Sequence, residues 1–173
     1  MLSKRVEDAL NKQINIELQA FYNYLAMSAW LDEQNLTGFA QWMKQQGVEE
    51  KNVHAMKFFD YVNDRDGTVR LEAIPKPECH YNSVLNLMES ALKMEQANTS
   101  SIHALYHLAV EDKDLGTASF LKWFIDEQVE EEKIMNDVLK LLKLAGDDRA
   151  ALLVLNQQLS KRSGPNVDVT AED

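Results

Sequence analysis

A chain of 173 residues with a formal net charge of −10 is long enough to bury a substantial core in one domain. Its acidity disfavours nucleic acid as a partner, because phosphate binding requires clustered Lys and Arg. Cys79 is the only cysteine, which excludes an intrachain disulfide and a CxxC metal site. We find no signal peptide and no run of about 18 apolar residues. We therefore expect a cytoplasmic protein without a membrane partner.

Four long segments have the composition and periodicity of α-helices, and turn signals separate them. An Asn-Asp-Arg-Asp-Gly sequence at residues 63–67 ends the second segment. The crossover after it contains Pro75 and Pro77, which forbid a helix there. Asn82 or Ser83 can cap the third segment. The expected long helices span approximately residues 3–33, 37–62, 83–110 and 116–144, and a shorter fifth helix spans approximately residues 149–159.

The lengths of the connections predict the topology. The first two helices and the last two long helices have short links, so each pair forms an antiparallel hairpin. The middle link has about 15 to 20 residues and, at about 3.3 Å per residue, can run the length of a bundle. The sequence thus predicts an all-α four-helix bundle with one long crossover and a short fifth C-terminal helix. We expect residues 1–160 to form this domain and residues 161–173 to be a disordered tail.

The inward-facing stripe of each long helix is apolar except near its middle, where a carboxylate stands at a core position. Burying a lone ionised carboxylate costs several kcal/mol, so four helices that do this at one depth need a compensating positive charge. No Lys or Arg lies in phase with the stripes unless Lys51 does, and a bound cation is the simplest remedy. Oxygen ligands with one imidazole, from His54, suit iron, manganese or zinc. The stripe carboxylates are Glu17, Glu50, Glu95, Glu127 and Glu131.

Around these residues the sequence resembles the prokaryotic non-haem ferritins, over about residues 2–160. The resemblance rests on NIELQAFYNYLAMSAW in the first helix, GFAQWMK and EEKNVHAMKFFDY in the second, and FLKWFIDEQVEEEK in the fourth. It implies a ferritin-like bundle that oxidises Fe(II) with O2 or H2O2 and stores the ferric mineral in a closed homo-oligomeric cage of 24 subunits. The apolar run at residues 150–155 fits an intersubunit contact in such a cage.

The resemblance also implies an iron-binding role for each stripe residue. One iron of a di-iron ferroxidase centre would be held by Glu17, Glu50 and His54. The second iron would be held by Glu50, Glu95 and Glu131, with Glu50 as the bridging ligand.

The same resemblance implies further residues around the centre. Tyr24 would hydrogen-bond a ligand and supply an electron, and Gln128 would lie near the oxygen-binding side. A third iron site would use Glu49, Glu127 and Glu130. The alternative for this last group is a solvated charge run, since three glutamates follow one another at residues 130–132.

The second helix departs from the family's Glu-x-x-His pattern by one extra residue, because Glu50 and His54 are four apart. One interpretation is that both residues still bind, being only about 40° apart on an ideal helix. A second is a π-bulge near residues 47–53 that absorbs the extra residue. A third places Lys51 at the bridging position, in which case the chain would be a non-catalytic subunit that only nucleates mineral.

Overall fold

The computed structural model describes residues 2–161, and the end of the chain, including nearly all of the expected tail, lies outside them. The described part is helical throughout apart from its connections. No helix in it combines the length and apolarity that crossing a membrane requires. Its elements are α1 (Lys4–Glu33), α2 (Thr37–Glu49), the π-helical segment η1 (Glu50–Ala55), α3 (Met56–Asp64), α4 (Val84–Glu111), α5 (Leu115–Ala145) and α6 (Arg149–Ser160).

Polar side chains cap most of the helices where the sequence indicates a start. The hydroxyl of Ser3 accepts a hydrogen bond from the Val6 backbone N–H, and Ser83 caps α4 in the same way. Asp114 and Asp148 begin α5 and α6. Each cap satisfies a backbone donor that the first turn of a helix leaves free, which fixes the helix ends close to their expected positions.

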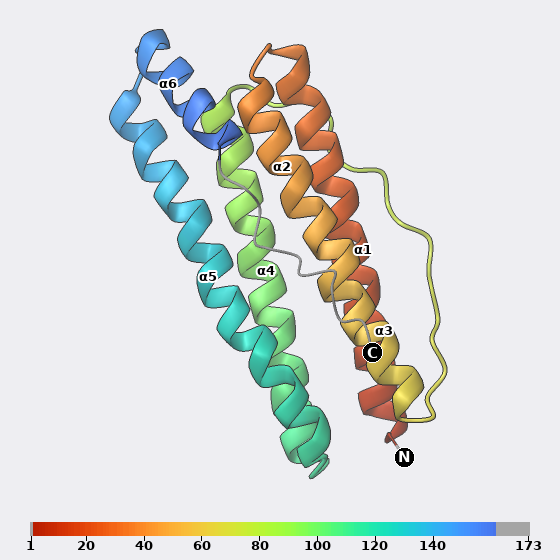
Figure 1. The fold of residues 1–173 in the computed structure, drawn as a ribbon. Coiled ribbons are helices and arrows are strands. Elements are labelled where there is room, and N and C mark those ends of the chain that lie inside the picture. The colour runs from red at the N-terminus through yellow and green to blue at the C-terminus, as the bar shows by residue number, and fades with distance from the viewer. Residues whose placement is uncertain (1, 162–173) are drawn as a thin grey trace, which may run out of the picture.

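The helices form a four-helix bundle made of two antiparallel hairpins (Figure 1). Helix α1 pairs with the continuous rod formed by α2, η1 and α3, while α4 pairs with α5. The long crossover between α3 and α4 runs beside α1 in Figure 1. This arrangement confirms the expected fold class, including the single long crossover and the short fifth helix.

Amide side chains on α1 hold the crossover in place. Asn11 donates to the carbonyl of Thr68, and Asn15 donates to the carbonyl of Arg70 over 3.0 Å. Asn15 also accepts from the backbone N–H of Glu72. These bonds satisfy backbone groups of a segment that has no regular secondary structure of its own, and they fix its path along α1.

Two close approaches in the bundle depend on glycine. A Cβ on Gly47 would lie 3.0 Å from the Cβ of Tyr24, so glycine lets α2 pack closely against α1 at that level. A Cβ on Gly38 would lie only 1.8 Å from the carbonyl oxygen of Asn156. The Asn156 side chain accepts hydrogen bonds from the backbone N–H groups of Gly38 and Phe39, which docks α6 onto the start of α2.

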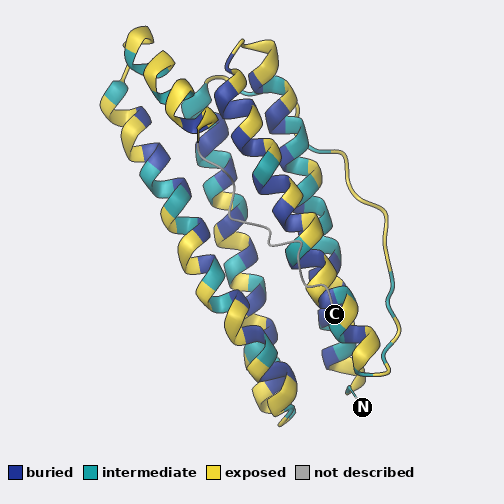
Figure 2. Cartoon of the chain, viewed as in Figure 1, coloured by how far each residue is buried: buried dark blue, intermediate teal, exposed yellow. Residues whose placement is uncertain are grey.

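Buried residues lie on the facing sides of the helices (Figure 2), and the apolar ones form two separate clusters. One cluster lies toward the α1–α2 turn and includes Leu31, Phe39 and Met88. The other lies toward the opposite end and includes Leu10, Phe58 and Ile102. A layer of buried polar residues separates them, comprising Gln13, Glu17, Gln46, Glu49, Glu50, His54, Glu95, Asn98, Gln128 and Glu131.

The helical phase of α5 differs from the expected one. The expected stripe included Glu127 as well as Glu131, but Glu127 is only half-buried. Gln128 instead occupies the buried position at that depth. A 3.6-residue helix drifts relative to a fixed repeat, which accounts for errors of one residue over so long a helix.

Candidate metal centre

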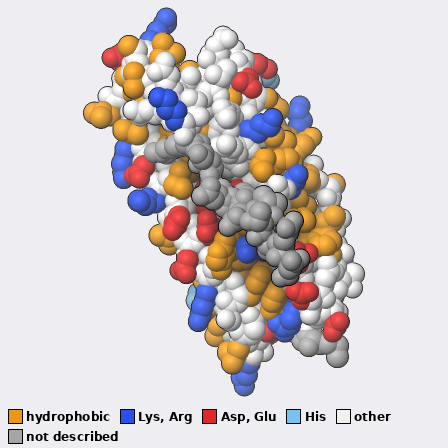
Figure 3. All heavy atoms as spheres, in the orientation of Figure 1, with side chains coloured by type: hydrophobic (Ala, Val, Ile, Leu, Met, Phe, Trp, Pro, Cys, Tyr) orange, Lys and Arg blue, Asp and Glu red, His pale blue; other side chains and the backbone are white. Residues whose placement is uncertain are grey.

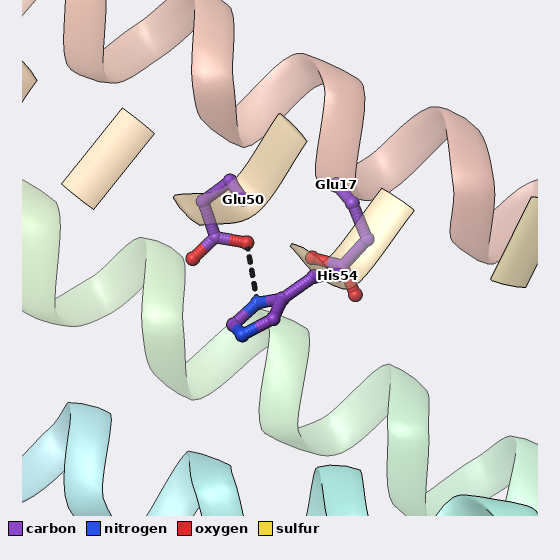
Figure 4. A group of neighbouring side chains, drawn as sticks. All are labelled: Glu17, Glu50 and His54. Atoms are coloured by element: carbon purple, nitrogen blue, oxygen red, sulfur yellow. Dashed lines mark hydrogen bonds and ion pairs between the residues drawn. The ribbon is translucent and has the colours of Figure 1, made fainter. Parts of the chain in front are cut away.

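The polar layer brings a histidine and two carboxylates to one point between the apolar clusters. Ligand atoms of Glu17, Glu50 and His54 all lie within 4.8 Å of one another, and the three side chains are buried. Figure 4 shows them converging, with Glu17 reaching in from α1 and the other two from η1. The distance from Nδ1 of His54 to Oε2 of Glu50 is 2.9 Å. One cation can be held by this group.

The π-helical segment positions Glu50 and His54. In a π-helix the ladder runs from residue i to i+5, so one extra residue is accommodated without changing the register of the flanking α-helices. η1 covers residues 50–55, close to where the π-bulge was expected. Both side chains are buried, while the intervening Lys51 and Asn52 are exposed. The extra residue therefore leaves Glu50 and His54 in the bundle interior.

Lys51 does not enter the polar layer. Its side chain is exposed, and its Nζ lies 5.4 Å from the centre of the Phe21 ring. Within residues 2–161, the buried polar and charged residues include no Lys or Arg. The carboxylates of the layer therefore have no lysine or arginine partner at their own depth.

Two further glutamates complete the layer. Glu95 of α4 accepts a short hydrogen bond from the Tyr24 hydroxyl and a longer one from the Gln128 amide. Glu131 of α5 accepts from the Gln46 amide over 3.0 Å. Each of these carboxylates is thereby held by side chains from neighbouring helices, and each keeps further lone pairs available for a cation.

Amide residues hold Glu17 in the same manner. Gln13 donates to one carboxylate oxygen over 2.7 Å, and Asn98 donates to the other over 2.9 Å. Gln13 also donates to the side-chain oxygen of Asn98, which links α1 to α4. Gln13, Gln46 and Asn98 were not among the predicted site residues. The spacing of Gln46 from Glu50, and of Asn98 from Glu95, is one helical turn and could have indicated two of them.

A second group of possible ligands shares His54 with the first. Ligand atoms of Glu49, His54 and Glu127 lie within 4.8 Å of one another. The Nε2 of His54 and the Oε2 of Glu49 are buried without a hydrogen-bond partner. Glu130, which was expected to complete a third site, is exposed and does not belong to this group. The structure thus brings Glu49 and Glu127 together with His54 but not with Glu130.

Burial and mutual repulsion shift the carboxylates of the layer toward their protonated forms. Burial, with repulsion from Glu50, raises the pKa of Glu17 well above its ordinary value. Burial, with repulsion from Glu95, does the same to the pKa of Glu50. The pKa of Glu131 is raised to about 8 and that of Glu49 to about 7, in both cases chiefly by burial. A bound cation would remove this penalty, because it compensates several negative charges at once.

A helical bundle with buried glutamates and one histidine projecting from its helices into the core is the architecture of carboxylate metal-binding proteins. The Ferritin family model, described as a ferritin-like domain, matches residues 7–145. The chain is 42% identical to a bacterial non-heme ferritin of Staphylococcus saprophyticus over 163 residues, covering 94% of this chain and 97% of the relative. It is 39% identical to that of Staphylococcus aureus, with 94% and 98% covered. This chain belongs to the ferritin family.

Solved structures agree with this assignment. The open-pore ferritin of Archaeoglobus fulgidus superposes with a TM-score of 0.93 at 41% sequence identity, covering 94% of this chain and all of the other. A form of that ferritin engineered to be closed gives the same TM-score, with 95% of this chain covered. The resemblance inferred from the sequence motifs is thereby confirmed.

Proposed function

We propose that this chain binds Fe(II) in the buried polar layer, oxidises it there and stores the Fe(III) product as a mineral inside a cage built from copies of itself. One observation carries the proposal: buried glutamates from four helices and from η1 meet a histidine at one depth, with no buried Lys or Arg among the residues that the structure describes. Such a layer is costly without a cation and favourable with one. Membership of the ferritin family supports iron as that cation.

We infer that the centre holds two Fe(II) ions. Glu17, Glu50 and His54, whose ligand atoms lie close together, would hold the first ion. Glu50, Glu95 and Glu131, which are buried in the same layer, would hold the second. Glu50 is suited to bridge the two ions, since its carboxylate has two oxygens. In the absence of iron, some of these carboxylates would carry protons, because the pKa values of Glu50 and Glu131 are raised.

The proposed reaction balances with one O2 for each pair of ions. Each Fe(II) loses one electron, and O2 takes up two electrons and two protons to give H2O2. Carboxylate ligands favour Fe(III) over Fe(II), because harder oxygen donors stabilise the higher charge. Tyr24 would orient Glu95 through its hydrogen bond and is close enough to the centre to supply an electron. Gln128 would hold the same carboxylate from the opposite side.

The group formed by Glu49, Glu127 and His54 supports a third iron position beside the pair. The Oε2 of Glu49 is buried there without a hydrogen-bond partner, and carboxylate oxygens are iron ligands. His54, whose neutral ring has a single free lone pair, would serve this position only while it does not hold the first ion. We propose that iron occupies this position on its way to or from the di-iron centre. Glu130, being exposed, would act at most as a distant acceptor on that path.

Storage requires an assembly, and we propose the closed 24-subunit cage that the family resemblance implies, located in the cytoplasm. Exposed apolar side chains at the α5–α6 end, including Leu144, Leu153 and Val154, suit contacts between subunits. Figure 3 shows hydrophobic side chains at that end, with charged side chains among them.

Stopped-flow oxidation tests the proposal. Fe(II) is added anaerobically to the apo-protein, O2 is admitted, and ferric absorbance is followed beside a Glu50→Ala variant. We expect a fast phase that saturates near two Fe(II) per chain, as a di-iron centre requires, and that the variant lacks. A slow rise that is unsaturable and identical in both proteins would instead indicate a mineral-nucleating subunit without a working centre. The exposed position of Lys51 argues against that second function.

A further inference from the structure

We propose that O2 reaches the metal centre through a pocket of about 410 Å³ on the α1–α4 side of the bundle, under the crossover segment. This inference rests on the proposed oxidation of Fe(II) and names the path of the oxidant. The pocket lies between α1, α4 and residues 72–75 of the crossover. It has the volume of a small-molecule site rather than of a packing defect.

The floor of the pocket belongs to the metal centre. Glu95 and Asn98 line it, and both are almost wholly buried. Glu95 is a proposed iron ligand, and Asn98 donates to the carboxylate of Glu17, another proposed ligand. A molecule in the pocket would therefore lie against two side chains that also belong to the metal centre. Small displacements of either side chain, on the time scale of side-chain motion, would admit a diatomic molecule.

The walls of the pocket suit a small apolar molecule. Aliphatic side chains from α1, α4 and the crossover make up half of the lining residues, among them Ile16, Ala20, Ile74, Met94 and Ala97. Apolar cavities in proteins stay dry and take up apolar gases such as xenon, and O2 is of this kind. Fe(II) binding is disfavoured in this pocket. Apart from Glu95, its only acidic lining residue is Glu72, and the positively charged Lys12 also lines the pocket.

The opposite side of the bundle is acidic rather than apolar near the metal centre. Helix α1 packs between the α2–η1–α3 rod and α4, so the side formed by α1 and α4 faces away from the side formed by η1 and α5. The latter side carries Glu49 and Glu127 beside His54, which suits a cation. The centre thus has an acidic approach on one side and an apolar approach on the other. With separate routes, a bound Fe(II) ion would not obstruct the route by which O2 reaches the centre.

The crossover is fixed as the roof of this pocket. Asn15 holds its first part through the carbonyl of Arg70 and the N–H of Glu72, and Gln19 donates to the carbonyl of Pro75 over 3.3 Å. Asn15 and Gln19 themselves line the pocket. The space beneath the crossover is therefore bounded by hydrogen bonds at both of its ends, so the pocket does not depend on a loosely held segment.

The test fills the pocket from α4 and compares the result with a matched control. Ala97→Trp places a large side chain in the lining, while Ala104→Trp, seven residues further along the same exposed face of α4, lies outside the lining. We expect the rate of oxidation at limiting O2 to fall about tenfold in A97W and to be unchanged in A104W. Anaerobic Fe(II) binding should be the same in all three assembled proteins.

Xenon provides a readout that does not depend on activity. Crystals of the wild-type protein and of A104W under xenon pressure should show a xenon atom in the pocket, and A97W should not. An unchanged O2 dependence in A97W, or wild-type crystals without xenon in the pocket, would overturn the inference. Failure of the proposed function is distinguishable, because then the wild-type protein would show no fast oxidation at any O2 concentration.

Discussion

The Nδ1 atom of His54 lies 2.9 Å from Oε2 of Glu50, although the two residues are one position further apart in the sequence than in the family's Glu-x-x-His pattern. The π-helical segment absorbs the extra residue at the point where both side chains are needed. A single-turn π-bulge in an otherwise α-helical rod is typical of functional sites, because it tolerates an insertion without turning the rest of the helix.

Deletion of Asn52 should therefore be tolerated. This exposed residue lies within η1, and its removal would convert the segment to a regular α-helix with the flanks in their present register. We expect the deletion variant to assemble and to retain the fast oxidation phase. Deletion of Lys44, an exposed residue in the regular helix α2, is the control. It should rotate the rest of the helix by about 100° and abolish assembly or activity. Loss of activity in both deletions alike would contradict this account.

The apo-protein should become less stable as the pH rises from about 5 to about 8. The pKa of Glu131 is about 8 in the folded chain and about 4.5 in the unfolded one, so the folded state keeps a proton that the unfolded state has released. This stability is present at low pH and is lost as the pH approaches the folded pKa. Glu131→Gln should therefore stabilise the apo-protein at pH 8, by about 1–4 kcal/mol. The measurement is the melting temperature against pH.

The matched control for this variant is Glu130→Gln, because Glu130 is the exposed neighbour of Glu131. E130Q should follow the wild-type pH profile closely. An E131Q profile that is indistinguishable from the wild type would mean that Glu131 is not held in its protonated form in the apo-protein.

Binding of Fe(II) should release protons and should strengthen as the pH rises toward about 8. Metal ligation requires the charged carboxylates, whereas Glu131 and Glu49, with pKa values of about 8 and about 7, are largely protonated at lower pH. Anaerobic calorimetry in buffers of different ionisation enthalpy measures the protons released. E131Q should release fewer protons than the wild type. Equal affinity across this pH range, with no proton release, would show that the carboxylates are already charged before iron arrives.

The third iron position should depend on Glu127 and not on Glu130. Glu127 shares its group with Glu49 and His54, whereas Glu130 is exposed outside it. We expect Glu127→Gln to remove one weaker Fe(II) equivalent per chain and Glu130→Gln to leave it in place. Mössbauer spectra of samples loaded with increasing iron would count the positions. Loss of the same equivalent in E130Q would restore the ligand set implied by the family resemblance.

The fold and the depth of the carboxylate layer were predictable from the sequence, because both follow from helical periodicity. Glu17, Glu50 and Glu95 lie on otherwise apolar stripes, and the structure buries all three. The position of Lys51 was not predictable, since an extra residue can be absorbed by a π-bulge or by a shift in register. The structure settles its location by exposing the lysine on the outside of η1.

The supporting amides were less visible in the sequence. Gln13, Gln46 and Asn98 are buried, but an amide on a helix is usually a surface residue, so only its partner reveals its role. The choice between Glu127 and Gln128 as the buried residue of α5 depended on the helical phase, which drifts over a helix of 31 residues. Predicting which of these residues are buried requires the rotation of each helix about its axis. That rotation is set by the packing of the helices and not by the local sequence.

Anomalous diffraction at the iron edge, from crystals soaked with Fe(II) without O2, tests the central claim most directly. The account predicts two iron peaks in the polar layer, one among Glu17, Glu50 and His54 and the other among Glu50, Glu95 and Glu131. Both peaks should disappear in Glu50→Ala, whose crystals provide the control. Iron found only at the surface of the subunit, with an empty polar layer in the wild-type protein, would contradict the account.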